Sequence, residues 1–227
     1  GEQRTAVILV NSVDNPIEPM TKGEVWDRFF NESYDEDRDG INESINSWIK
    51  EVSYERAWLR GEVYGWYSLS NETELCSVFG GETLQEIMTI ADSDINFLNY
   101  KRLIFIIPYS DLCSYFGIGY VGMIDLETPD GIASLSINEL NGISQINNGY
   151  GVHELGHNFG VFHAGYLDCG ASILGENCYP WGRFDTYDVM GGFPMFMQFG
   201  FNSGHYNSYH KEKIGWLNES NIIEINE

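Results

Sequence analysis

Short apolar runs and amphipathic segments alternate along the first two thirds of the chain. Residues 6–10 (AVILV) and 103–107 (LIFII) are continuous apolar runs of strand length, which is typical of strands buried on both faces. The aromatic and β-branched segment 58–67 is predicted to be a further strand. Two shorter strands are predicted at 119–125 and 132–137, and we expect 119–125 to form an edge of the sheet.

Other segments carry the 3.6-residue spacing of a helix. Apolar residues recur at i, i+3, i+4 and i+7 between residues 43 and 54, which predicts an amphipathic helix there. Further helices are predicted over 84–98 and 144–159, and the chain beyond residue 160 is predicted to be mostly irregular. Strands that alternate with helices before an irregular tail indicate an α+β fold.

The last predicted helix carries the sequence HELGHNFGVFH, residues 153–163. His153 and His157 are four residues apart, so they lie on one helical face and can bind a single ion at about 2.0–2.1 Å. On a continuing helix His163 would lie about 9 Å further along the axis than His157. Gly160 allows the chain to turn, because glycine adopts positive φ without a Cβ penalty. Three imidazoles leave a fourth tetrahedral position open, as in catalytic zinc sites, and Glu154 is expected beside that position.

A methionine follows downstream in YDVMGG, where it is Met190. The zinc motif followed by a methionine turn resembles the metzincin metallopeptidases. HELGHNFGVFHAGYLDCG, YDVMGG and GHYNSYHKEKIGWL are together similar to the gametolysin family of metzincins, with a likeness that extends from about residue 5 to about residue 217.

This resemblance implies a secreted zinc endopeptidase that hydrolyses extracellular proteins or glycoproteins. It implies one catalytic domain over 1–227, with an upper lobe of a twisted mixed sheet and helices (about 1–160) and a mostly irregular lower lobe (about 161–227). Met190 would pack beneath the imidazoles, and Glu154 would be the general base for water activated by zinc. The alternative is a non-catalytic, calcium-dependent binding or adhesion module on the same scaffold.

The same resemblance directs attention to the residues after Met190. Some metzincins have a zinc-binding tyrosine two residues after the methionine, but position 192 is glycine here. Tyr187, His205 and His210 are alternative candidates to stabilise the oxyanion. Four residues are predicted to line a substrate pocket, with a role in the lower-lobe core as the alternative: Phe193, Pro194, Met195 and Phe196.

The composition limits the partners. The 227 residues contain 12 basic and 34 acidic side chains, for a formal net charge of −22. Such a surface repels nucleic acid and anionic lipid, so we expect neither as a partner. The charge either attracts cationic substrates or only solvates the protein. No apolar run is long enough to span a membrane, and we expect a monomer that acts on protein or peptide substrates.

The four cysteines allow three disulfide connectivities. Cys169 and Cys178 flank a short loop, which favours a local bridge, and Cys76 would then pair with Cys113. Two disulfides would indicate an oxidising compartment, whereas the alternative is four buried thiols.

Asp35, Asp37 and Asp39 form D-x-D-x-D-G with Gly40, which is the opening of a calcium loop. The twelfth position, where an EF-hand has a bidentate glutamate, is Asn46. The segment is therefore either a calcium site or an acidic surface turn.

Overall fold

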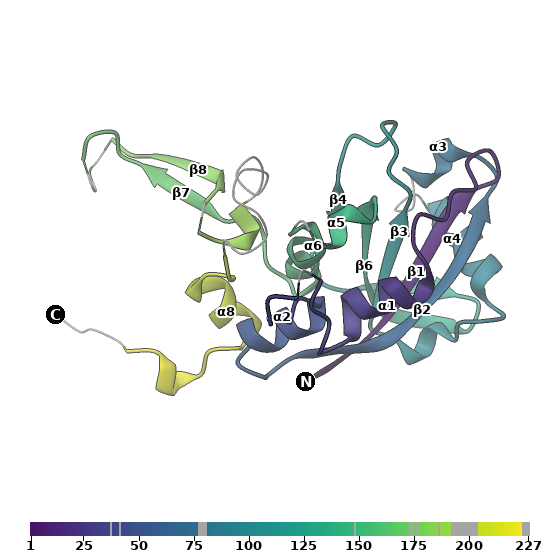
Figure 1. Ribbon diagram of the computed structural model, residues 1–227. Coiled ribbons are helices and arrows are strands. Elements are labelled where there is room, and N and C mark those ends of the chain that lie inside the picture. The colour runs from purple at the N-terminus through teal and green to yellow at the C-terminus, as the bar shows by residue number, and fades with distance from the viewer. Residues whose placement is uncertain are drawn as a thin grey trace.

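A mixed sheet with a parallel centre organises the protein (Figure 1). The computed structural model describes residues 1–36, 38–40, 42–76, 81–147, 149–172, 175, 177–185, 187–191 and 204–223. The strands of the main sheet are β1 (Glu2–Ser12), β2 (Trp58–Leu69), β3 (Arg102–Ile107), β4 (Gly117–Gly119), β5 (Ile124–Thr128) and β6 (Gly131–Asn141). Their order is β2-β1-β3-β6-β4, and β5 also pairs with β6. Strands β2, β1, β3 and β6 are parallel, whereas β4 and β5 are antiparallel to β6.

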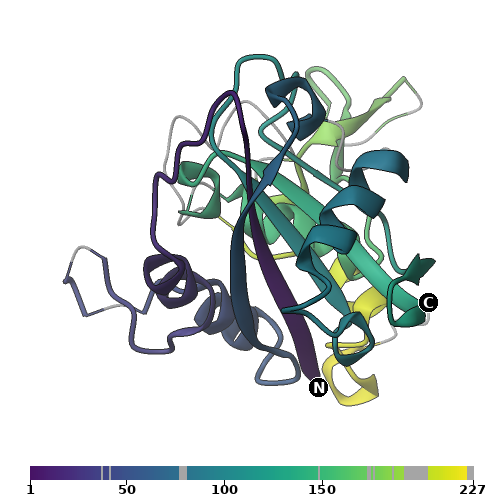
Figure 2. The same ribbon diagram turned by 90° about the vertical axis from the view of Figure 1, so that its right-hand side faces the viewer.

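Helices cover both faces of this sheet. The helices are α1 (Lys22–Phe30), α2 (Ile45–Val52), α3 (Glu72–Leu75), α4 (Gly81–Ala91), α5 (Ser144–Asn147), α6 (Tyr150–Asn158) and α8 (Ser208–Ile214), with short 3₁₀ turns η1 (Phe97–Asn99), η2 (Val189–Gly191) and η3 (Glu219–Asn221). Figure 2 shows α1 and α2 on one side of the sheet and α4 on the other. The fold is therefore mixed α and β, as predicted.

Alternate residues of the strands separate into two cores. Val7 and Leu9 of β1 join the core beneath α1, α2 and α6, whereas Ala6 and Ile8 join the core beneath α4. Successive side chains of a strand point to opposite faces, so a continuous apolar run supplies both cores. The first core extends to η2 and to Trp216 near the C-terminus, so residues on both sides of position 160 share it.

Several predicted boundaries were wrong. The helix predicted over 144–159 is interrupted before α6, where Gly149 has φ +82°. The strand predicted over 119–125 is not continuous, because Gly122 has φ +82° and donates its N–H to the His157 carbonyl at 2.8 Å. The edge strand beside α6 is instead β4. The helix predicted over 84–98 stops at Ala91, where a turn follows.

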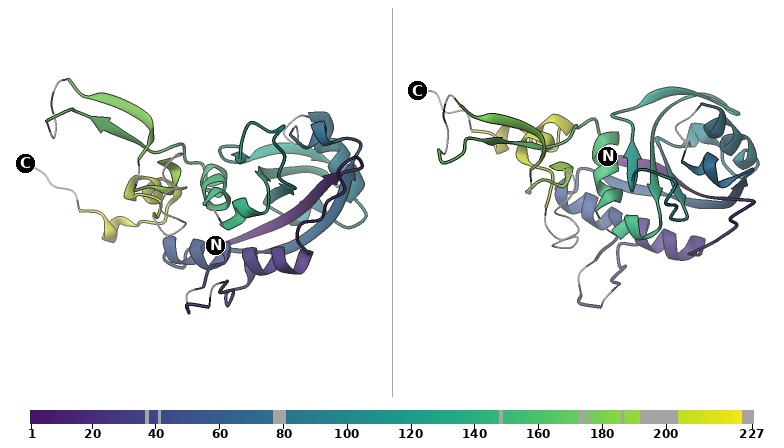
Figure 3. Two further views of the ribbon diagram at one scale, coloured as in Figure 1. Left: turned by 45° about the horizontal axis from the view of Figure 1, so that its top comes forward. Right: turned by 90° about the horizontal axis from the view of Figure 1, so that it is seen from above.

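The chain after residue 160 is more regular than predicted. Strands β7 (Gly165–Asp168) and β8 (Tyr179–Phe184) form an antiparallel hairpin, and α8 follows further along. The hairpin extends away from the sheet, as both views in Figure 3 show. All residues of both strands are exposed, so they lack the alternation of buried and polar positions that predicts a strand.

Candidate metal centre

Two of the three motif histidines lie on helix α6, and the turn after the helix brings the third close to them. The helix ends at Asn158, and Gly160 has φ +95°, a conformation that favours glycine. His153, His157 and His163 then each offer a ring nitrogen, and these atoms lie within 4.8 Å of one another. Among the described residues this is the one group of three His, Cys, Asp or Glu side chains that could hold a metal ion.

The backbone around the site orients two of the imidazoles. The Nδ1 atom of His153 lies 2.8 Å from the Val189 carbonyl, and the Nδ1 atom of His157 lies 2.9 Å from the Val161 carbonyl. Each Nδ1 therefore donates its proton to a carbonyl, which leaves Nε2 as the ligand atom. Such hydrogen bonds to the second ring nitrogen fix the tautomer of metal-binding histidines.

The three imidazoles are held neutral. Burial is the main cause that lowers the pKa of His153 to about 3 and that of His163 to about 4. Burial also lowers the pKa of His157. Neutral imidazole is the form that binds a metal, and nitrogen ligands suit zinc and other transition metals. The residues present therefore fit a divalent metal ion.

Glu154 lies on α6 and lines a cavity together with the three histidines. Burial raises the pKa of its carboxyl group to about 8. The carboxylate packs against β4: a Cβ added at Gly117 would lie 2.8 Å from its Oε1 atom, and one added at Gly119 would lie 3.0 Å from Oε2. A larger residue at either position would displace this carboxylate.

Met190 lies beneath α6 and is fully buried. A Cβ added at Gly156 would lie 2.3 Å from the Met190 sulfur, so glycine permits this close approach. Asp188 holds the turn that carries Met190: its Oδ1 atom accepts the Met190 N–H at 2.6 Å, and its Oδ2 atom accepts from His210 Nδ1 at 2.8 Å. The Val189 carbonyl bonded to His153 belongs to the same turn, so this turn also orients a candidate ligand.

A cavity of about 420 Å³ opens beside these groups. It lies between the segment 114–119, α6 and the end of β8, and Tyr150, Arg183 and Phe184 contribute to its lining. The antiparallel strand β4 forms part of its wall. A cavity of this size, in which polar side chains converge beside aromatic ones, is typical of a site that binds a small group or part of a chain.

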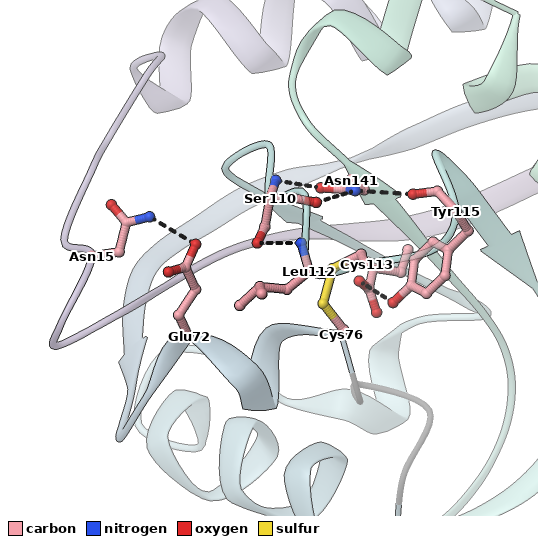
Figure 4. The surroundings of a disulfide bond; sticks show 9 residues. Asn15, Glu72, Cys76, Ser110, Leu112, Cys113, Tyr115 and Asn141 are labelled. Carbon is pink, nitrogen blue, oxygen red and sulfur yellow. Dashed lines mark hydrogen bonds between the residues drawn. A yellow bond between two sulfur atoms is a disulfide. The ribbon is translucent and has the colours of Figure 1, made fainter.

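The loop before β4 is anchored at several points (Figure 4). The Asn141 side chain donates to the carbonyls of Ser110 and Tyr115, at 3.0 and 2.9 Å, and a disulfide joins Cys113 to Cys76. The second disulfide joins Cys169 to Cys178, so the predicted pairing is confirmed. Two disulfides are typical of an oxidising environment. Within the described residues, every helix is too short or too polar to cross a membrane.

The other predicted site residues lie elsewhere. His210 is buried against Asp188, His205 contacts Glu51, and Tyr187 is exposed; none of the three lines the cavity. Asp35 accepts the backbone N–H groups of Asp39 and Gly40 within its own loop. The remaining predicted site residues lie outside the described residues: Asp37, Phe193, Pro194, Met195 and Phe196.

Sequence reasoning missed two parts of this site. The glycines of β4 had a signal in the pattern Gly-Ile-Gly at 117–119, because glycine within a strand marks a close approach. Arg183 had none, since a single arginine in an aromatic segment does not point to a metal site.

Comparisons with known proteins add no family assignment. No protein-family model matches the chain, and a search of curated proteins found no match either.

Proposed function

We propose that the protein is a zinc-dependent endopeptidase of metzincin type, similar to the gametolysin family, that acts on proteins outside the cell. One observation carries this proposal: three neutral imidazoles converge within 4.8 Å beside a buried carboxylate in a cavity bordered by an edge strand. The parallel strands with an antiparallel edge strand beside the helix that carries the histidines support this proposal.

His153, His157 and His163 would hold a zinc ion, which would supply a Lewis acid to polarise a carbonyl group and to lower the pKa of a water molecule towards about 7. The positive charge of a bound metal would favour the ionised form of Glu154. Glu154 then takes the proton from the water molecule that attacks the peptide carbonyl, and returns it to the leaving amine nitrogen. The glycines of β4 leave room for its carboxylate between the strand and the helix.

Strand β4 supports an extended substrate. It is the terminal strand of the sheet order, and its three residues pair with β6 on one side. A peptide that adds to its other edge extends the sheet, and main-chain hydrogen bonds then position the scissile bond beside Glu154.

The test compares the wild-type protein with Glu154→Gln. Both proteins are expected to bind one zinc per chain by metal analysis, and casein cleavage is expected to fall by a factor of about 10²–10⁴ in the variant, the typical contribution of general acid–base catalysis. Glu82→Gln, an exposed glutamate on α4, is the control and should keep full activity. Full activity of Glu154→Gln would overturn the role of Glu154. A zinc-loaded wild-type protein that binds partners with calcium but cleaves nothing would favour the adhesion alternative.

A further inference from the structure

The end of β8 departs from regular strand geometry where it meets the cavity. Tyr166 pairs with Trp181, but the preceding residue, Gly165, pairs with Phe184, so Gly182 and Arg183 have no partner in the ladder. This is a β-bulge, a feature that is common beside active sites because it redirects a side chain.

Phe184 completes the distortion. Its φ is +80°, a left-handed conformation that a residue with a Cβ rarely adopts. Arg183 and Phe184 are consecutive, yet both line the cavity beside the histidines. In a regular strand, consecutive side chains point to opposite faces. The strained backbone therefore directs two neighbouring side chains into one site.

Arg183 faces the candidate metal ligands. It lines the same cavity as His153, His157 and His163. It is the one lysine or arginine among the residues that line the cavity, where Glu154 is the one acidic residue.

The described carboxylates leave Arg183 without an ion pair. No described residue forms an ion pair with it, although the chain has 34 acidic and 12 basic side chains. Of the six other arginines, three contact a glutamate: Arg4, Arg28 and Arg60. A guanidinium offers a planar fork of N–H donors that matches a carboxylate. As far as the described residues extend, the Arg183 guanidinium is thus open to a carboxylate from outside.

We propose that Arg183 is an anion-binding subsite that takes the carboxylate of a glutamate or aspartate beside the scissile bond of the substrate. The inference rests on the proposed endopeptidase function and adds a substrate class to it. A side-chain carboxylate fits better than the reaction oxyanion, because Arg183 is solvent-exposed on the hairpin, whereas oxyanion donors act in sites that exclude water.

The first experiment measures cleavage of peptides that carry Glu, Gln or Lys at each position flanking the scissile bond. The wild-type protein should favour Glu over Gln at one position by about fivefold in kcat/KM, as expected for a partly exposed charged pair. Arg183→Gln should remove this preference mainly through KM, Arg183→Lys should keep part of it, and Arg183→Glu should favour the Lys peptide. Arg60→Gln, which changes an exposed arginine on β2, should behave as the wild type.

The second experiment measures peptide binding without turnover. Glu154→Gln should bind the Glu peptide about fivefold more tightly than the Gln peptide, and the double variant with Arg183→Gln should bind both equally. Equal binding by the single variant would overturn the subsite. An equal loss of kcat for both peptides in Arg183→Gln would also overturn it, in favour of an oxyanion role. A wild-type protein that cleaves nothing but still distinguishes the two peptides would overturn the endopeptidase function alone.

Discussion

Helix α6 and the β7–β8 hairpin border the same cavity, but one is buried and the other is exposed. Every residue of α6 from Gly151 to Asn158 is buried, and the carbonyls of two other segments fix its histidines. All residues of both hairpin strands are exposed, and strand pairing with one disulfide holds them. The difference separates two tasks: groups that bind a metal or move a proton need a fixed, dry setting, whereas a group that selects a substrate can sit in solvent.

The largest effect is expected from removing Asp188, a buried side chain that supports the turn beneath α6. Asp188→Ala deletes a buried carboxylate that accepts hydrogen bonds from Met190, Asn207 and His210. It should lower the free energy of unfolding by about 3–5 kcal/mol, because those donors lose a buried charged partner. Urea denaturation measures the change.

Asp168→Ala is the matched control on the hairpin, where the carboxylate accepts the Gly170 N–H. It should change the free energy of unfolding by less than about 0.5 kcal/mol. Equal losses of unfolding free energy for Asp188→Ala and Asp168→Ala would contradict the difference between the buried region around α6 and the exposed hairpin.

The two disulfides give the next largest contrast. Cys76 and Cys113 are separated by 37 residues in the sequence. Replacing both with serine should lower the free energy of unfolding by about 4 kcal/mol, according to the relation between loop length and entropy. The bridge between Cys169 and Cys178 spans nine residues in a hairpin without its own core. Its removal should shift the global transition by less than about 1 kcal/mol but speed proteolysis in the hairpin, since the opening is local. Limited proteolysis with thermal melting separates the two; a large melting shift for the second pair would contradict a locally opening hairpin.

Packing beneath α6 supplies a smaller effect. Gly156→Ala places a Cβ within 2.3 Å of the Met190 sulfur and 2.7 Å of the Tyr206 ring, so it should cost about 1–3 kcal/mol by overpacking. Gly182→Ala in the hairpin meets nothing within 4 Å and should cost less than about 0.5 kcal/mol. Thermal denaturation of both variants at one pH is the measurement, and an unchanged melting temperature for Gly156→Ala would show that Met190 moves aside freely.

The stability of the protein should also depend on pH. Burial raises the pKa of Glu139 to about 8, although the Tyr115 hydroxyl donates to it at 2.8 Å. A carboxyl group with a raised pKa in the folded state favours folding while protonated, so its contribution is lost as pH rises from about 4.5 to about 8. Glu139→Gln should therefore reduce the fall in stability over this window, by at most about 1.4 kcal/mol per pH unit. Denaturation at several pH values tests this, and parallel curves for the wild type and the variant would refute it.

The sequence predicted secondary structure correctly where a continuous apolar run is enough to identify a strand. The runs at 6–10 and 103–107 lie within β1 and β3 because both faces of those strands are buried. The prediction failed where the conformation of one residue ends an element. Gly149 interrupts the predicted helix, and Gly122 interrupts the predicted edge strand. Glycine tolerates both helical and left-handed conformations, so periodicity alone does not show which one the chain adopts.

The sequence likewise predicted only one part of the candidate site. Helical spacing and the glycine turn bring His153, His157 and His163 together, and these are local properties that the chain carries in eleven consecutive residues. The resemblance implied the Met190 turn beneath them. Only the tertiary structure decided the other groups that face them: the glycines of β4 against Glu154, Asp188 bonded within that turn, and Arg183 from the bulge in β8. These contacts join segments far apart in the sequence, and the strand order and packing of the whole chain set them. A local pattern such as Gly-Ile-Gly at 117–119 can therefore signal a close approach without showing which residue makes it.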